Sequence, residues 1–158
     1  DDVNRIAGAW IASGQGLDLV GLMNKKAVEL GMNNSIFHDS AGLNDDALST
    51  SGDLVKLVGY ALRLDELWSI LGEKTTKVYS IDGRIEHNLN STNQLLGVIT
   101  DVVGGKTGYT DGALGCMLLV VDVPGKNDKL ISVVLGSTER FTDTEKLINW
   151  TKRAYSWD

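Results

Sequence analysis

Apolar residues recur at helical spacing in the first third of the chain. Residues 3–12, VNRIAGAWIA, have this spacing, and a Ser-Gly pair then interrupts it. A stronger helical pattern begins at Asp18 and ends at Gly31, since a glycine just beyond the last turn is typical of helix termination. The apolar positions of this second helix recur at steps of three or four: Leu19, Leu22, Met23, Ala27 and Leu30.

A second helical region follows a long polar connection. Residues 32–50 have no regular period and are rich in Asn, Asp and Ser, which favours a loop. A Ser or Thr at 49–51 can cap the next helix. The negative charge of Asp53 would stabilise the first turn of that helix. Its predicted apolar face consists of Leu54, Leu57, Val58, Ala61 and Leu62. A short helical piece over 67–71 follows, and Gly72 ends it.

The second half of the chain has the patterns of strands and a closing helix. Two short runs within 75–89 meet at Asp82–Gly83, a dipeptide typical of tight hairpin turns. An amphipathic helix over about 142–155 closes the chain. Between them, three further strands are predicted at 102–109, 113–122 and 129–136.

This order of elements predicts the fold class. Helices followed by antiparallel strands and a closing helix are typical of an α+β layered fold, with the sheet covered by the C-terminal helix. No repeat or linker divides the 158 residues, so we expect a single domain over 1–158.

Composition and charge exclude several classes of function. A net charge of −6 without a basic stripe argues against a nucleic-acid partner. His38, His87 and Cys116 are not spaced as metal ligands, so we expect no metal and no other cofactor. Cys116 lies in an apolar strand and is interpreted as a small core residue. No apolar run is long enough for a membrane-spanning helix.

The tripeptide Lys106-Thr107-Gly108 is the strongest candidate for chemistry. A lysine supplies positive charge for a substrate carboxylate, and a threonine hydroxyl can donate a hydrogen bond to it. A glycine lets another backbone approach the strand closely, so that an extended peptide can add as a further strand. The alternative is an ordinary hairpin with a surface lysine, because so short a string often occurs by chance.

The surroundings of this tripeptide resemble one enzyme family. The passage VVGGKTGYTDGALGCMLLVV is similar to the corresponding strand of the D-alanyl-D-alanine carboxypeptidases, the low-molecular-weight penicillin-binding proteins. Further segments resemble that family in the same order: VGLMNKKAVELGMNNSIFHDSAGLND, STSGDLVKLVGYAL, HNLNSTNQLL and ERFTDTEKLINW. The resemblance covers essentially the whole chain.

The resemblance implies a fold, a reaction and a location. It implies part of the β-lactamase/transpeptidase-like fold, and acyl transfer through a serine that trims the terminal D-alanine of peptidoglycan stem peptides. β-Lactam antibiotics are then expected ligands, at the extracytoplasmic face of the membrane or outside the cell. Lys106, Thr107 and Gly108 would form one wall of the cleft. Arg140 would pair with the substrate carboxylate, although it equally fits an ordinary helix start.

The family's nucleophile is missing. No serine of the chain has a lysine three residues later, so there is no Ser-x-x-Lys motif. The asparagine of the family's Ser-x-Asn motif falls on Asp2, which can accept but not donate a hydrogen bond. Ser91-Thr92-Asn93 matches Ser-x-Asn literally, but we interpret it as coincidental because its segment resembles another part of the family.

The chain is therefore expected to be the C-terminal portion of an incomplete domain. It begins with Asp1–Asp2 and not with Met, which favours a processed product or an excised piece. We expect it to be inactive alone and to pair with the missing N-terminal part or with another copy. Two alternatives are a non-catalytic module that binds peptides or β-lactams, and a relative of the serine β-lactamases. A Ser-x-x-Lys upstream would favour an enzyme over the module.

Overall fold

The computed structural model describes residues 18–123 and 125–156. The predicted helix at 3–12 and Asp2 lie outside the described residues. The helices are α2 (Leu19–Glu29), α3 (Ser51–Ala61), α4 (Asp65–Leu71) and α5 (Arg140–Ala154). The strands are β1 (Thr75–Tyr79), β2 (Glu86–Asn90), β3 (Val102–Thr110), β4 (Leu114–Asp122) and β5 (Lys129–Ser137). The predicted α+β class is confirmed, and the three long strands start and end within one residue of the predicted ranges.

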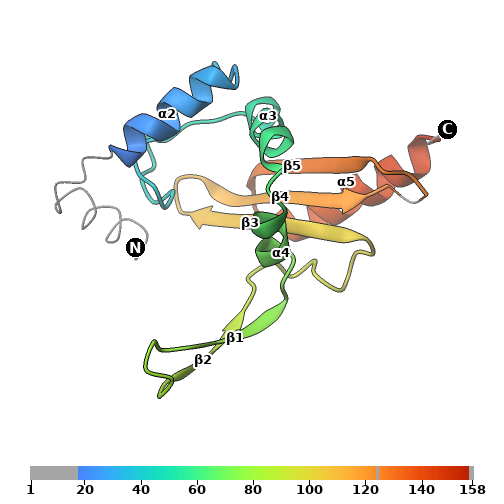
Figure 1. The fold of residues 1–158 in the computed structure, drawn as a ribbon. Helices are drawn as coiled ribbons and strands as arrows, with labels where there is room; N and C mark the ends of the chain where they lie inside the picture. Colours follow the sequence, from blue (N-terminus) through green and yellow to red (C-terminus); the bar gives the residue numbers. More distant parts are fainter. Residues whose placement is uncertain (1–17, 124, 157–158) are drawn as a thin grey trace.

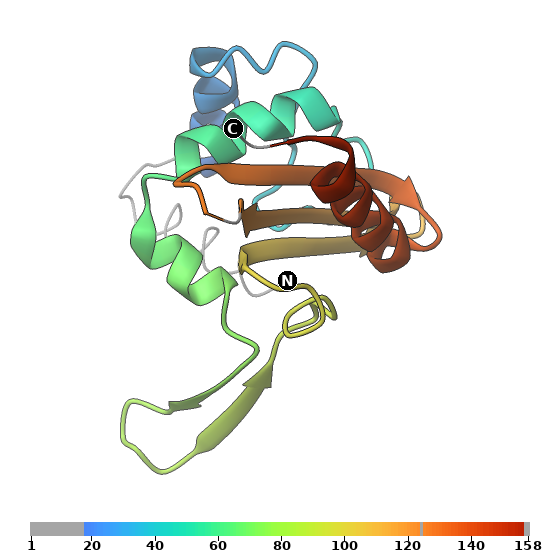
Figure 2. The ribbon, with the colours of Figure 1, turned by 90° about the vertical axis from the view of Figure 1, so that its right-hand side faces the viewer.

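The sheet has two differently covered faces. Strands β3, β4 and β5 pair antiparallel in that order, so β3 lies at an edge of the described sheet. Helix α5 covers one face, as predicted, and α3 and α4 lie against the other (Figure 2). Successive side chains of β4 point to opposite faces, which is why its apolar run contributes to both.

Each face of the sheet has its own apolar cluster. On the α5 face, Ile148 packs with Met117 and Leu119 of the central strand. On the other face, Val58 of α3 and Trp68 of α4 pack with Val120. The indole N–H of Trp68 donates to the Ala61 carbonyl at 2.8 Å, which fixes α4 relative to α3. The central strand β4 therefore joins the two clusters.

The helix ends follow the signals in the sequence. Gly31 has a φ of +69°, and its N–H donates to the Val28 carbonyl at 3.0 Å. The Met32 N–H donates to the Ala27 carbonyl at 2.9 Å, so this end of α2 is a Schellman motif. The hydroxyl of Thr50 accepts from the Asp53 N–H and caps α3.

The hairpin of β1 and β2 projects away from the sheet (Figure 1). Its turn contains Asp82–Gly83, as the sequence predicts: the Gly83 N–H donates to the Ser80 carbonyl at 2.7 Å, and Gly83 has a φ of +71°. The paired strands end at Tyr79 and Glu86, so residues 80–85 connect them. The Ser80 N–H donates to the Ile85 carbonyl at 2.9 Å, and the Ser80 hydroxyl accepts from the Ile85 N–H, so these two bonds close the turn.

Two glycines let α4 end against the start of β3. A Cβ atom at Gly72 would lie 2.7 Å from the Val103 carbonyl oxygen, and one at Gly104 would lie 3.0 Å from the Leu71 carbonyl carbon. This close approach positions β3 for the site described below. Helix α5 begins at Arg140, two residues before the predicted start. No helix in the described part of the chain has the length and apolar character needed to cross a membrane.

Candidate active site

The predicted site tripeptide lies in the middle of the edge strand β3. Lys106 pairs with Leu118, Thr107 with Met117 and Gly108 with Cys116. Paired residues share a face of the sheet. Lys106 and Gly108 therefore lie on the α3–α4 face, whereas Thr107 lies on the α5 face.

An apolar groove opens between α3, α4 and this face of the sheet. Its volume is about 500 Å³. The helices contribute Leu54, Leu57, Val58, Tyr60, Ala61, Leu64, Leu67, Trp68 and Leu71 to its lining. The sheet contributes Lys106, Thr107, Gly108, Cys116, Met117, Leu118, Val133 and Leu135. Among the described residues that line the groove, Lys106 alone carries a charge.

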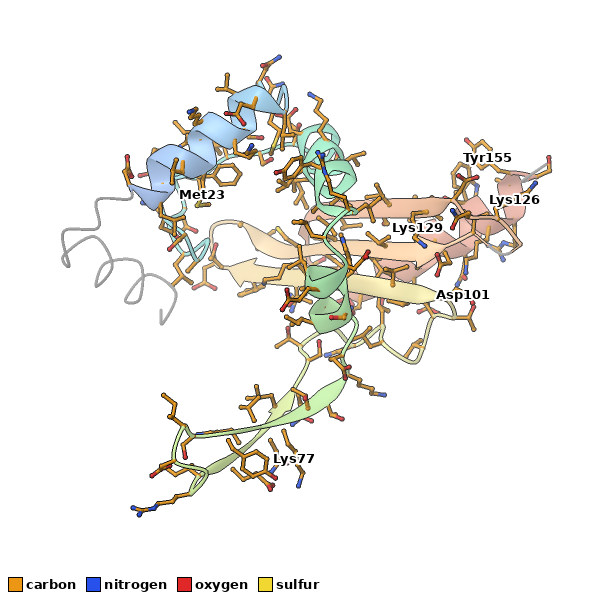
Figure 3. All side chains as sticks on the ribbon, viewed as in Figure 1. Met23, Lys77, Asp101, Lys126, Lys129 and Tyr155 are labelled. Carbon is orange, nitrogen blue, oxygen red and sulfur yellow. The ribbon has the colours of Figure 1, made fainter. Side chains whose placement is uncertain are left out.

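The charge of Lys106 is available to a ligand. Its ammonium donates to the Thr107 main-chain carbonyl, and no carboxylate in the described part of the chain forms an ion pair with it. Other lysines lie elsewhere: Figure 3 places Lys77 on the projecting hairpin and Lys126 and Lys129 at the end of the sheet near Tyr155.

A smaller polar pocket of about 240 Å³ adjoins the same strand. It lies between β3, the end of α4 and the segment 90–93 that follows the hairpin. The hydroxyl oxygens of Thr92 and Thr107 are 2.6 Å apart, a hydrogen-bond distance. The amide nitrogen of buried Asn93 also lies here and has no partner among the described residues. The Ser91-Thr92-Asn93 segment therefore contacts the candidate site.

The glycines of β3 differ in how much space surrounds them. A Cβ atom at Gly105 would lie 2.6 Å from the Leu118 carbonyl oxygen, so packing within the sheet requires a glycine there. A Cβ atom at Gly108 would lie 3.6 Å from the Cys116 Cβ, an ordinary contact. The described fold therefore has no steric need for a glycine at 108.

Arg140 lies near the end of β3 that follows the tripeptide. Its side chain runs along Gly115, and its guanidinium carbon is 5.7 Å from the ring centre of Tyr109 and 4.7 Å from that of Phe141. Its Nε is buried without a partner in the described structure. This geometry is compatible with both interpretations of Arg140. It is the first residue of α5, as an ordinary helix start requires, and its Nε donor has no partner in the described structure, as a carboxylate-binding residue would allow.

The site contains no arrangement of metal ligands. In the part of the chain that the structure describes, no group of three or more His, Cys, Asp or Glu side chains could hold a metal ion. Cys116 is only half-buried and lines the apolar groove, so its interpretation as a core residue is wrong. Its strand alternation directs it to a face that the described helices only partly cover.

The contribution of Thr92 and Asn93 was not predicted from the sequence. Their segment matches Ser-x-Asn but was expected to have no place in the site. Their position fourteen and thirteen residues before Lys106, just after a hairpin that returns toward the sheet, was the available signal. The contact itself depends on how the hairpin ends, which the local pattern does not reveal.

The chain is similar to known proteins in sequence. A profile of the D-alanyl-D-alanine carboxypeptidase family matches residues 4–139. A D-alanyl-D-alanine carboxypeptidase from Escherichia coli is 35% identical over 156 residues, which cover 95% of this chain and 37% of that protein. The chain thus spans well under half the length of this curated relative.

Solved structures have the same fold. A penicillin-binding protein from Listeria monocytogenes, in its cefotaxime-bound form, matches with a TM-score of 0.71 and 37% identity over 85% of this chain and 55% of that chain. A DD-transpeptidase from Streptomyces matches with a TM-score of 0.75 and 29% identity over 83% of this chain and 52% of that chain. The expected transpeptidase-like fold is thereby confirmed, for a chain that covers about half of each solved structure.

Proposed function

The chain belongs to the D-alanyl-D-alanine carboxypeptidase family, and from this premise we propose that it forms the substrate-binding wall of a serine acyl-transfer site. The substrate is a peptidoglycan stem peptide, from which the terminal D-alanine is removed. β-Lactams bind at the same wall. The reaction takes place outside the cell or at the extracytoplasmic face of the membrane, where such peptides occur.

Each residue of the tripeptide has a role in this proposal. The ammonium of Lys106 attracts the substrate carboxylate and stabilises negative charge that develops near it. The Thr107 hydroxyl donates a hydrogen bond to that carboxylate, and the Arg140 guanidinium, beside Tyr109 of the same strand, is a second positive charge for it. Gly108 leaves room for the peptide backbone to pair with the open edge of β3.

The nucleophile comes from a segment that this chain lacks. A serine oxygen attacks the peptide carbonyl and a lysine accepts its proton. The D-alanine amine leaves with a proton, and water then hydrolyses the acyl-serine. No Ser-x-x-Lys occurs in the 158 residues, so this chain cannot complete these steps alone.

We assign the apolar groove as the seat of that segment. The groove is lined almost wholly by carbon, which is costly to leave in water, and Lys106 and Gly108 line the same space. A helix placed there would bring a serine and a lysine to the strand that binds the substrate. The short coverage of the relatives supports a partner segment of this kind.

The observation that carries the proposal is the position of Lys106, Thr107 and Gly108. They lie at an open strand edge, beside an apolar groove. No ion pair of the described fold accounts for Lys106, and packing within the fold does not require a glycine at 108.

Labelling with a fluorescent penicillin tests the proposed function. The chain is assayed alone and after it has been supplied with the Ser-x-x-Lys segment predicted to precede it, with a Ser→Ala variant of that segment as the matched control. We expect covalent label only with the intact segment. Absence of label in every sample would contradict a serine acyl-transfer site.

A non-catalytic binding module is the second candidate. The observation in its favour is that the chain has an open peptide-binding edge and no nucleophile. It predicts reversible binding of a D-Ala-D-Ala peptide to the chain alone, without covalent label in any sample. A relative of the β-lactamases would instead acquire label and release it quickly.

A further inference from the structure

The hydroxyl groups of Thr92 and Thr107 form a pair at the edge of β3. Their oxygens are 2.6 Å apart, although the residues are fifteen positions apart in the sequence. Thr107 has no other hydrogen-bonded side chain among those described, so Thr92 alone orients its hydroxyl.

The segment that carries Thr92 is firmly anchored. The Ser91 N–H donates to the Lys74 carbonyl at 2.9 Å, and the Ser91 hydroxyl accepts from the Asn93 N–H at 3.2 Å. Asn93 is 4% exposed, and its side-chain oxygen accepts from the Leu95 N–H at 3.0 Å. Leu95 itself packs in the cluster on the α5 face. Hydrogen bonds of both neighbours, Ser91 and Asn93, therefore fix the main chain at Thr92.

Either hydroxyl can donate at this distance, and the two directions leave different protons free. Each threonine hydroxyl has one proton, and the short contact uses one of the two. If Thr107 donated to Thr92, its proton would be unavailable to a substrate carboxylate. If Thr92 donates, the Thr107 proton remains free, and the chain Thr92 to Thr107 to carboxylate is polarised in one direction.

We infer that Thr92 is a positioning residue, which donates to Thr107 and holds the Thr107 hydroxyl in the orientation that donates to the substrate carboxylate. This inference rests on the proposed function in one respect, the carboxylate ligand. The coupling between the two threonines does not depend on catalysis and can be measured in the chain itself.

The first test measures the Thr107 rotamer in the chain alone. Three-bond couplings of the Thr107 methyl group report its χ1 angle by NMR. We expect a single rotamer in the unmodified chain and in Thr92→Ser, and averaging between rotamers in Thr92→Val. The variant Thr76→Val, which removes an exposed hydroxyl from β1, is the control and should leave Thr107 unchanged. A single unchanged rotamer in Thr92→Val would overturn the inference.

The second test compares two substrates in the chain supplied with the Ser-x-x-Lys segment. One is a D-Ala-D-Ala peptide with a free carboxylate, and the other is its C-terminal amide. We expect Thr92→Val to slow acylation by the acid about three- to tenfold, as loss of one neutral hydrogen bond would, and to leave the amide unchanged. Thr92→Ser should restore the rate with the acid.

The two failures are distinguishable. An equal loss with acid and amide would show a merely structural role for Thr92 and overturn the inference while acylation itself persisted. No acylation of the unmodified protein would refute the proposed function, and the rotamer measurement would still decide whether Thr92 orients Thr107.

Discussion

The two faces of the sheet differ in how completely their apolar residues are covered. On the α5 face, Leu119 and Ile148 are 0% exposed. On the α3–α4 face, Leu64 is 46% exposed and Leu67 is 39% exposed, although both lie on the side of their segment that lines the groove. The helix patterns on both faces are similarly amphipathic, so the difference lies in what covers them.

This difference indicates where the described structure is complete. The sheet and α5 bury each other's apolar side chains, and the loop 91–99 adds Leu95 and Ile99 to the same cluster. Helices α3 and α4 contact the sheet but leave a groove of about 500 Å³ between them. The edge strand with Lys106 lies at the boundary, held by the completed face and open toward the incomplete one.

Truncating one large apolar side chain on each face should give the largest contrast. Ile148→Ala removes a fully buried side chain and should lower the free energy of unfolding by about 2–5 kcal/mol. Leu67→Ala should cost about 1 kcal/mol or less, because its side chain already meets water. Urea denaturation of both variants measures the contrast.

Adding the Ser-x-x-Lys segment sharpens this first comparison. If the segment covers the groove, the cost of Leu67→Ala should rise toward that of a buried leucine, whereas the cost of Ile148→Ala should not change. Equal costs for the two variants in the chain alone would contradict the difference between the faces.

Substitutions of two glycines of β3 should have different effects, because Gly105 is required for packing within the sheet and Gly108 is proposed to make room for a ligand. Gly105→Ala places a Cβ against the Leu118 carbonyl oxygen and should destabilise the fold by about 1–3 kcal/mol. Gly108→Ala meets only an ordinary contact and should change stability by about 1 kcal/mol or less. Thermal unfolding measures both effects.

The same pair should reverse its order in penicillin labelling of the completed site. Gly108→Ala should slow labelling strongly although it folds normally, because its methyl group occupies the edge along which the ligand pairs. Normal labelling of Gly108→Ala would refute the role assigned to this glycine.

The smallest expected effect concerns acid, because the α3 side of the molecule depends on a buried carboxylate. Asp53 is held by the Lys56 ammonium at 2.8 Å, by the Asn34 N–H at 2.8 Å and by the Ser35 hydroxyl at 3.0 Å. The bond from Lys56 is the main cause that lowers the pKa of Asp53 below its ordinary 3.8, and the other two donors act with it against desolvation.

A lowered pKa in the folded state stabilises the protein above the unfolded-state pKa, and this contribution is lost as the pH falls through the folded-state pKa. Asp53→Asn should therefore lower the melting temperature at neutral pH, and the difference should shrink as the pH falls below 3.8, the ordinary pKa of an aspartate. Asp46→Asn, in the preceding exposed loop, controls for loss of a surface charge. A difference for Asp53→Asn that persisted in acid would contradict this explanation.

Local patterns in the sequence predicted most of the fold. The apolar run within 113–122 and the glycine at 31 act within a few residues, so they predicted β4 and the end of α2. The Asp82–Gly83 dipeptide likewise predicted the turn of the hairpin, where the Gly83 N–H donates to the Ser80 carbonyl and Gly83 has a positive φ.

The site was predicted only in part, for a physical reason. Lys106, Thr107 and Gly108 lie together in one strand, so a local motif could reveal them. The contact of Thr92 with Thr107 joins two segments through the fold, and the half-exposed position of Cys116 depends on what covers its face. Neither leaves a mark in a short stretch of sequence.

Hydrogen exchange of the backbone amides tests the central claim most directly, namely that the α3–α4 face is incomplete and is covered by a Ser-x-x-Lys segment. We expect α3 and α4 to exchange faster than β4 and α5 in the chain alone. Protection of α3 and α4 should then rise selectively when the segment is added. Equal protection of both faces in the chain alone, unchanged by the segment, would contradict the claim.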